Sequence, residues 1–297
     1  MPDNQLKRVS SYDRLFDQSQ TKNYNLSIRL NPDGLSFSVF SLSHKKYIAV
    51  ESVYFPDSLP AQGSSLATTL YLDLVARAID EKPWLLHKFN HKCVVYSTRR
   101  YTLVPEPLFN NSLAEEYLYF AHKKVEDEKI LTCRINSAES QLVFGIETKI
   151  FKELHTWFPE MQLLPHLAAL IESVVPAFKH TELSDPVFLN INNKQLDIII
   201  LKGNRLAFAN SFEWRSSSDI VYFLLFVLDQ LSLNPGKVPL FLLGETEAGD
   251  EHYQLIYKYV RNVEFLKRTE SYTRSYAMEV VKCHKYFDLL NPALCEL

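Results

Sequence analysis

The sequence predicts a mixed α/β fold made of two similar halves, each with a five-stranded mixed sheet and flanking helices. Residues 25–40 and 187–201 lead to this prediction, because each contains a strand, a tight turn and a second strand. In both places a third strand and then a helix follow. The same order of elements twice in one chain indicates an internal duplication, and 297 residues are enough for two domains.

The first hairpin has the clearest pattern. Apolar side chains alternate with polar ones from Leu26 to Leu30 and again from Leu35 to Val39, as in half-buried strands. The Asn-Pro-Asp-Gly sequence at 31–34 predicts the turn between them. Proline fixes φ, aspartate suits the next position, and we expect Gly34 to take the left-handed conformation. The second hairpin turns at 192–194.

The elements of the first half are predicted from apolar periodicity and from the residues that end helices and strands. Residues 1–22 are polar and are expected to be a disordered lead. An apolar stripe over 66–79, with a serine cap before it and Pro83 after it, predicts a helix. Residues 92–103 are rich in β-branched and aromatic residues and predict one strand, which the prolines at 105 and 107 end.

An inserted subdomain is expected over about 110–146. Ser112 and Glu115 form a capping-box pattern before a short helix over 113–123. The charged residues at 126–129 predict a turn between that helix and two strands, at 130–135 and 141–146. Two further helices, over 149–157 and 163–175, complete the first half.

We place the boundary between the halves in the polar segment before Pro186, which gives a first half over 23–180 and a second over 181–297. After the second meander, residues 219–231 are apolar almost all round and predict a buried helix. A strand over 238–243, a helix over 250–260 and a strand over 263–267 follow, and the tail is expected to be helical around 283–290.

Composition excludes several classes of function. A net charge of −3 gives no basic patch for nucleic acid. The longest apolar run, 220–228, is far shorter than the ~20 residues that span a bilayer. The four cysteines lie far apart without metal-ligand spacing, and we expect free thiols in a reducing cytoplasm. The chain has 7 glycines, too few and too scattered for a typical phosphate-binding loop.

This order of elements resembles the duplicated actin-like ATPase fold, which is ribonuclease H-like. The resemblance covers residues 25–297 and is greatest to the actin-like proteins of pilus and type II secretion assembly. More narrowly, the chain resembles an uncharacterised Bacteroides-type family with this fold. The resemblance implies a bacterial protein with a ligand cleft between its halves.

The nucleotide motifs of that fold are degraded in this sequence. Where the resemblance implies an aspartate on the first strand of each half, Arg29 and Asn190 stand instead. Where it implies a Gly-Gly pair for adenosine, only Gly244 remains, and it is followed by Glu245. We therefore expect neither ATP hydrolysis nor a bound cofactor, although Mg-ATP is retained as an alternative ligand. No catalytic residue and no metal site is predicted.

The candidate binding residues are polar groups in the turns that would face the cleft. Turn chemistry alone also explains most of them. They are Asn31, Asp33, Asn192, Asn193, Lys194, Gly244, Glu245 and Thr246.

Two functions remain from the sequence. The first is a non-catalytic interaction or scaffold protein, with a protein partner that contacts the inserted segment or the C-terminal tail. The second is a divergent nucleotide or small-ligand binder that uses the cleft. A cytoplasmic location is expected in both cases, and the oligomeric state is not predicted.

Overall fold

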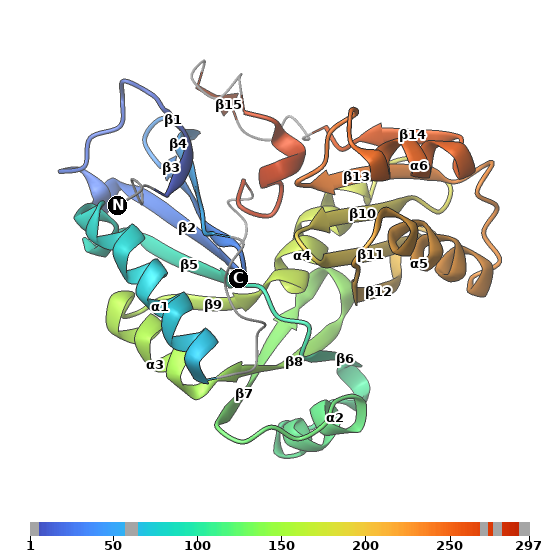
Figure 1. Cartoon of the computed structure of the whole chain (residues 1–297), viewed down its shortest axis with the longest axis horizontal. Helices are drawn as coiled ribbons and strands as arrows, with labels where there is room; N and C mark the ends of the chain where they lie inside the picture. The colour runs from blue at the N-terminus through green and yellow to red at the C-terminus, as the bar shows by residue number, and fades with distance from the viewer. Residues whose placement is uncertain (1–5, 57–64, 268–272, 276–280, 291–297) are drawn as a thin grey trace. The chain divides into compact units, whose positions relative to one another are not determined.

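The computed structural model describes residues 6–56, 65–267, 273–275 and 281–290. The chain forms two compact units (Figure 1). Unit 1 holds the described residues up to Ala169, with those of 273–281 and Leu289–Leu290. Unit 2 holds those from Leu170 to Lys267 and 282–288.

Unit 1 is built on a seven-stranded mixed sheet, and the five strands predicted for this half were wrong because β1 and β15 also pair with β4. Its strands follow the order β1-β4-β3-β2-β5-β9, and β15 also pairs with β4. The meander β2-β3-β4 is antiparallel, whereas β5 and β9 run parallel to β2. The strands are β1 (Lys7–Tyr12), β2 (Tyr24–Asn31), β3 (Gly34–Ser41), β4 (Lys46–Tyr54), β5 (His91–Tyr96), β9 (Gln162–Pro165) and β15 (Thr273–Arg274).

Helices cover one face of this sheet, where Leu26, Ile28 and Phe37 are buried against α1 (Ser65–Asp80) and α3 (Thr148–Trp157). The sequence predicted half-buried strands, but β2 and β3 are buried on both faces. On the other face Ser38 donates a hydrogen bond to the Leu289 carbonyl oxygen at 2.7 Å. The polar side chain of Ser38 therefore has its hydrogen-bond partner inside the protein.

Two expectations about the first hairpin had different outcomes. The predicted turn is present, because Asn31 pairs directly with Gly34. The left-handed conformation expected for Gly34 was wrong, since this residue is not among those with positive φ. A Cβ at this position would lie 2.3 Å from the Val53 carbonyl oxygen, so the close approach of the next strand is what requires glycine.

Three segments of unit 1 differ from expectation. Residues 7–12, within the predicted disordered lead, form β1 and pair with β4; residues 1–5 lie outside the described residues. The predicted strand over 92–103 is two strands, β5 and β6, interrupted where the Thr98 hydroxyl accepts a hydrogen bond from the Arg100 amide. The helix expected from residue 163 begins later, because 162–165 pairs with β5 as β9.

An inserted three-stranded sheet lies between β5 and α3 in the sequence. Its order is β6-β8-β7, and both pairings are antiparallel. Leu118 of α2 (Ala114–Ala121) packs on this sheet against Val104 and Val143. The strands are β6 (Tyr101–Pro105), β7 (Glu128–Ile135) and β8 (Ser140–Glu147).

Unit 2 contains the five-stranded sheet that the sequence predicts, in the order β12-β11-β10-β13-β14. This is the order of β4-β3-β2-β5-β9 in unit 1, with the same strand directions. The five strands are β10 (Val187–Asn192), β11 (Gln195–Lys202), β12 (Arg205–Glu213), β13 (Pro239–Gly244) and β14 (Asn262–Phe265).

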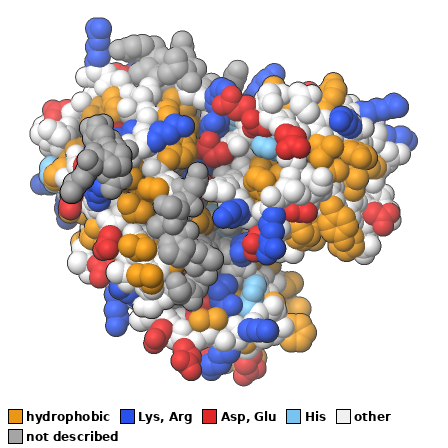
Figure 2. Space-filling model, in the orientation of Figure 1, with side chains coloured by type: hydrophobic (Ala, Val, Ile, Leu, Met, Phe, Trp, Pro, Cys, Tyr) orange, Lys and Arg blue, Asp and Glu red, His pale blue; other side chains and the backbone are white. Residues whose placement is uncertain are grey.

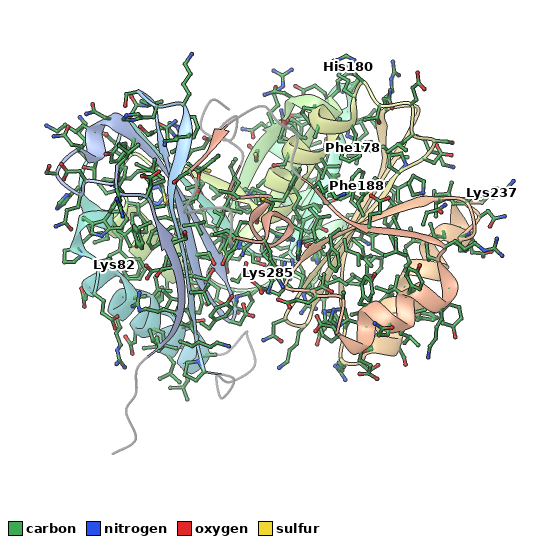
Figure 3. The ribbon with its side chains drawn as sticks, turned by 90° about the horizontal axis from the view of Figure 1, so that it is seen from above. Lys82, Phe178, His180, Phe188, Lys237 and Lys285 are labelled. Atoms are coloured by element: carbon green, nitrogen blue, oxygen red, sulfur yellow. The ribbon has the colours of Figure 1, made fainter. Side chains whose placement is uncertain are left out.

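Helices cover both faces of the second sheet. On one face, α5 (Ser217–Gln230) and α6 (Glu251–Tyr259) contribute to the core. On the other face, Phe178 of α4 (His166–Phe178) packs on Phe188, with ring centroids 4.7 Å apart (Figure 3). Among the described residues, the short 3₁₀ helices are Thr21–Asn23, Pro83–Leu86, Glu106–Leu108, Asn111–Leu113, Asn136–Ala138 and Cys283–Tyr286.

The division into compact units falls inside α4, before the boundary at 180/181 that the sequence suggested. In the part of the chain that the structure describes, no helix is long and apolar enough to cross a membrane. The cysteines at 93, 133 and 283 are free thiols, and Cys295 lies outside the described residues.

Candidate functional site

The candidate site in unit 2 is the loop that follows β13, residues 244–250, which we call the β13 loop. It leaves the carboxyl end of a parallel strand, where α/β proteins usually bind ligands. Gly244 has φ +83°, and a Cβ there would lie 2.3 Å from the Ile191 carbonyl oxygen. The Glu245 amide donates a 2.7 Å hydrogen bond to the same oxygen. Glycine therefore lets the loop turn directly against β10.

The β13 loop is held by a segment from the end of the chain, residues 282–288, which we call the C-terminal clamp. Lys285 Nζ lies 3.0 Å from a Glu245 carboxylate oxygen and 3.1 Å from one of Glu247. Lys282 Nζ lies 2.8 Å from the other oxygen of Glu247. The imidazole of His284 lies 2.9 Å from the Thr246 carbonyl oxygen, and Thr246 is fully buried. Figure 3 shows Lys285 within this region.

The charges of the clamp and the loop support each other. Hydrogen bonds from Lys282 and Lys285 lower the pKa of Glu247 to about 2. Burial opposes the charge of Lys285, but Glu245 and Glu247 outweigh it and raise the pKa of Lys285. Burial lowers the pKa of His284, against the effect of its bond to Thr246. Glu247 and Lys285 are therefore charged at neutral pH, whereas the imidazole of His284 favours the neutral form.

A second set of contacts joins the β13 loop to the β10–β11 turn. Thr246 Oγ1 lies 2.7 Å from His252 Nε2, and the His252 ring is 6.3 Å from the ring of Trp214. Trp214 donates its indole N–H to the Asn192 carbonyl oxygen at 2.9 Å. Burial lowers the pKa of His252, against the charges of Asp250 and Glu251.

The sequence analysis missed Asp197, which lies beside the position where the fold would place a carboxylate. Asn190 on β10 is paired in register with Asp197 on β11. Asp197 is fully buried and accepts hydrogen bonds from Asn190 at 2.8 Å, from Gln195 and from the Ser211 hydroxyl. An acidic residue inside the run Leu196–Leu201 was the available signal, because charge is rarely buried unless it is paired.

The equivalent row of paired residues across the three strands of the meander in unit 1 carries no carboxylate. Arg29 on β2 is paired with Ser36 on β3, and Ser36 bonds the Ser52 hydroxyl of β4 at 2.7 Å. The corresponding row of unit 2 is Asn190, Asp197 and Ser211. The two rows occupy equivalent places in their sheets and have different chemistry.

The predicted site residues fall into two groups. Asn31 and Asp33 lie in unit 1, where Asp33 accepts the Phe55 amide through its carbonyl oxygen at 2.8 Å. The other six lie in unit 2, where the structure connects Gly244, Glu245 and Thr246 to Asn192 through the contacts above. Asn193 and Lys194 are exposed at the tip of the turn, and Lys194 has φ +57°. Within the described ranges, no group of three or more His, Cys, Asp or Glu residues is placed to hold a metal ion.

Comparison with known proteins identifies the fold. The family described as "Protein of unknown function (DUF3822)" matches residues 13–263. A Bacteroides thetaiotaomicron protein with an actin-like ATPase fold and unknown function is similar, with TM-score 0.75 and 24% identity over 85% of this chain and 94% of that one. The PilM-PilN type IV pilus biogenesis complex gives TM-score 0.53 and 11% identity over 90% of this chain and 96% of that one. No curated protein matches. The predicted actin-like fold is confirmed.

Proposed function

The chain belongs to the DUF3822 family, and we propose that it is a non-catalytic interaction protein on an actin-like scaffold. The observation that carries the proposal is the C-terminal clamp. The loop that would accept adenosine in this fold is instead bonded to the chain's own residues 282–288 through two lysines and a histidine. A nucleotide would have to displace these contacts.

The first strands of the two sheets support the same proposal. Arg29 brings a positive charge to the place where an aspartate would organise Mg²⁺, and Asn190 brings a neutral amide. Asp197, the nearby carboxylate of unit 2, already accepts three hydrogen bonds from side chains. Asp197 is thus the carboxylate of these two rows, and its oxygens already accept hydrogen bonds from the protein.

Exposed aromatic side chains offer a surface for a partner. The sequence predicted that the helix over 219–231 is buried, but Tyr222 and Phe226 of α5 are 62% and 48% exposed. Their rings stack at 6.1 Å. Hydrophobic side chains gather over α5 and α6 at the right of Figure 2. Aromatic residues are enriched at protein interfaces, and the similar PilM structure is itself a complex with PilN.

A thermal-shift titration with Mg-ATP and Mg-ADP tests the absence of nucleotide binding. A nucleotide that binds would, at 100 times its Kd, stabilise the chain by about 2.7 kcal/mol and raise its melting temperature. Because the proposal implies that no nucleotide binds, we expect no change in melting temperature. A partner should be captured by the wild-type chain and lost with Tyr222→Glu/Phe226→Glu. Glu264→Lys, a charge change elsewhere in unit 2, is the control. A clear nucleotide-dependent shift in the wild-type chain would contradict the proposal.

A second candidate function is nucleotide or small-ligand binding at the β13 loop. It is favoured by the polar contacts between the clamp and the loop, which are ion pairs of two lysines and a bond of His284. Lys282→Ala/Lys285→Ala removes three ion pairs from the loop. A nucleotide that raises the melting temperature of this variant, but not of the wild-type chain, would identify a site that the clamp covers.

We also propose that the two halves, 23–180 and 181–297, arose by duplication and that the protein is cytoplasmic. The matching strand orders and the equivalent rows support the duplication. The free thiols at Cys93, Cys133 and Cys283 are in keeping with a reducing compartment.

A further inference from the structure

The inserted sheet of unit 1 has a long edge strand. In the described part of the chain, β7 pairs with β8 and with no other strand. It is eight residues long and contains neither proline nor glycine. An edge of this kind presents a row of backbone N–H and C=O groups to a further strand.

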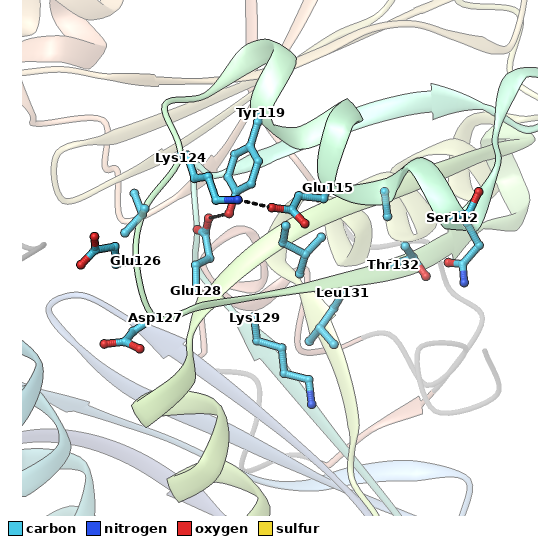
Figure 4. A pocket seen from close by; sticks show the side chains of 14 residues that line it. Ser112, Glu115, Tyr119, Lys124, Glu126, Asp127, Glu128, Lys129, Leu131 and Thr132 are labelled. Atoms are coloured by element: carbon cyan, nitrogen blue, oxygen red, sulfur yellow. Dashed lines mark hydrogen bonds and ion pairs between the residues drawn. The ribbon is translucent and has the colours of Figure 1, made fainter.

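A hollow of about 890 Å³ runs along this edge (Figure 4). The residues of β7 that line it are consecutive, from Glu128 to Thr132. Residues on one face of a strand recur at every second position, so a consecutive run shows that the hollow follows the edge of β7 and not one of its faces. Its other walls are the loop 124–127 and five residues in and just before α2, namely Asn111, Ser112, Ala114, Glu115 and Tyr119.

The basic side chains of β7 are held on the faces of the sheet by contacts within the chain. Lys129 Nζ lies 3.7 Å from the centroid of the Phe151 ring, and Arg134 Nε lies 3.6 Å from a Glu106 carboxylate oxygen. Edge lysines and arginines commonly prevent unwanted pairing. Here the partners of these two groups lie outside β7, in α3 and in the 3₁₀ helix Glu106–Leu108.

The rim of the hollow is acidic. Glu126 and Asp127 are exposed and line it, and neither has an ion-pair partner among the described residues. Glu115 is already paired with Lys124 at 2.6 Å, and Figure 4 shows this pair across the hollow from β7. A ligand that runs along β7 would therefore meet two uncompensated carboxylates at one end.

We propose that the edge of β7 binds an extended, basic segment of a partner protein, which adds a strand antiparallel or parallel to β7. This inference rests on the proposed interaction function. Main-chain hydrogen bonds would hold the segment, and lysine or arginine side chains would meet Glu126 and Asp127.

Hydrogen exchange of the isolated chain tests whether the edge is available. Amides of an edge strand point alternately to the neighbouring strand and to solvent, so we expect alternate amides within 129–132 to exchange rapidly. Protection of all of them, or a dimer whose contacts protect them, would overturn the proposal.

A synthetic peptide of alternating lysine and valine, about as long as β7, tests the chemistry. We expect saturable binding by fluorescence anisotropy, with the rapid amides of 129–132 becoming protected. The same peptide with every amide N-methylated keeps its charges and loses its backbone donors, so it should not bind. Equal binding of both peptides, or no binding at about 1 mM peptide, would overturn the proposal.

Matched variants locate the site. Glu126→Lys/Asp127→Asn should weaken the lysine–valine peptide about tenfold, because it removes two rim carboxylates. Glu116→Lys changes the charge by two units, against three for the rim variant, on α2 outside the hollow, and should leave the affinity unchanged. If both variants lose equal affinity, binding is non-specific attraction to charge and the proposal fails.

Affinity capture separates this proposal from the proposed function. If the wild-type chain and Glu126→Lys/Asp127→Asn capture the same partner equally, the interaction function stands and the β7 site is wrong. If the wild-type chain captures nothing that a boiled control does not, the proposed function itself fails.

Discussion

The third strands of the two meanders, β4 and β12, have equivalent places in their sheets but different surroundings. The interior residues of β4 are all buried, whereas β12 alternates between exposed and half-buried residues. The cause is β1, which pairs along β4; the described part of unit 2 has no such strand beside β12. The N-terminal segment thus converts an edge strand into an interior strand. Polar side chains of β4 that would otherwise meet solvent therefore need partners within the protein.

Glu51 of β4 is a buried charged residue with such partners. It is 1% exposed and lies beside β1, with Arg8 Nη1 at 2.6 Å, the Tyr12 hydroxyl at 2.7 Å and Lys82 Nζ at 3.1 Å. Its equivalent in unit 2, by register, is Asn210, which is exposed. The same place in the sheet holds a buried charge network in one unit and a solvated amide in the other.

Glu51→Ala should have the largest effect on stability. Removing one partner of a buried charge network leaves the others unpaired, and we expect unit 1 to lose about 4 kcal/mol. Urea unfolding followed by fluorescence of Trp84, with the other two tryptophans replaced by phenylalanine, reports on unit 1. Asn210→Ala, followed through Trp214, should cost less than about 0.5 kcal/mol. Equal losses would show that β1 does not create the difference.

Asp197→Ala should have the next largest effect, in unit 2. It leaves the side-chain donors of Asn190, Gln195 and Ser211 without this acceptor, and we expect a loss of about 3 kcal/mol in urea unfolding followed through Trp214. Ser36→Ala, at the equivalent position of unit 1, should cost about 1 kcal/mol. A larger loss of stability for Ser36→Ala than for Asp197→Ala would contradict the assignment of Asp197 as the main hydrogen-bond acceptor among these residues.

Gly244→Ala should destabilise unit 2 by about 2 kcal/mol, because the new Cβ meets a backbone oxygen and φ is positive. The equivalent residue in unit 1 is Tyr96, because it pairs with Leu30 as Gly244 pairs with Ile191. Glycine is therefore needed in unit 2, where the loop turns against β10, and not at the equivalent position of unit 1. Gly203→Ala has positive φ without a clash and should cost about 1 kcal/mol in the same urea assay. Equal costs would mean that the close approach does not matter.

The smallest effect concerns the pH dependence of the clamp. The pKa of His284 is lower in the folded chain than in the unfolded chain, so its contribution is complete above about pH 6.5 and is lost as the pH falls below that value. We expect the urea midpoint reported by Trp214 to fall between about pH 7 and pH 5. His284→Gln keeps a donor for the Thr246 carbonyl oxygen and should reduce this slope; an unchanged slope would assign it to other groups, such as His252.

The hairpins could be predicted from sequence because their information is local. Alternation from Leu26 to Leu30 and the Asn-Pro-Asp-Gly turn specify β2 and β3 without help from the rest of the chain. β1 could not be predicted in this way, since KRVSSY has no apolar alternation and becomes a strand by pairing with β4. β9 has four residues and was assigned to the helix that follows it.

The candidate site was predictable only in part, for the same reason. The position of Gly244 after a buried strand marked the β13 loop, and the structure does connect this loop to the β10–β11 turn through Trp214 and His252. The clamp was missed, because no local pattern relates Lys285 to Glu245 forty positions earlier. Contacts of this range arise from the fold and not from spacing in the sequence.

The hydrogen bond between Ser38 and the Leu289 carbonyl oxygen joins residues 251 positions apart within unit 1. Domains usually complete their folding in the order in which they are synthesised. Here the ribosome synthesises β10 to β14 of unit 2 before it synthesises β15 and Leu289, which both belong to unit 1. The unit that begins the chain is therefore the last to be finished, and truncation before Thr273 removes contacts from the first-made sheet.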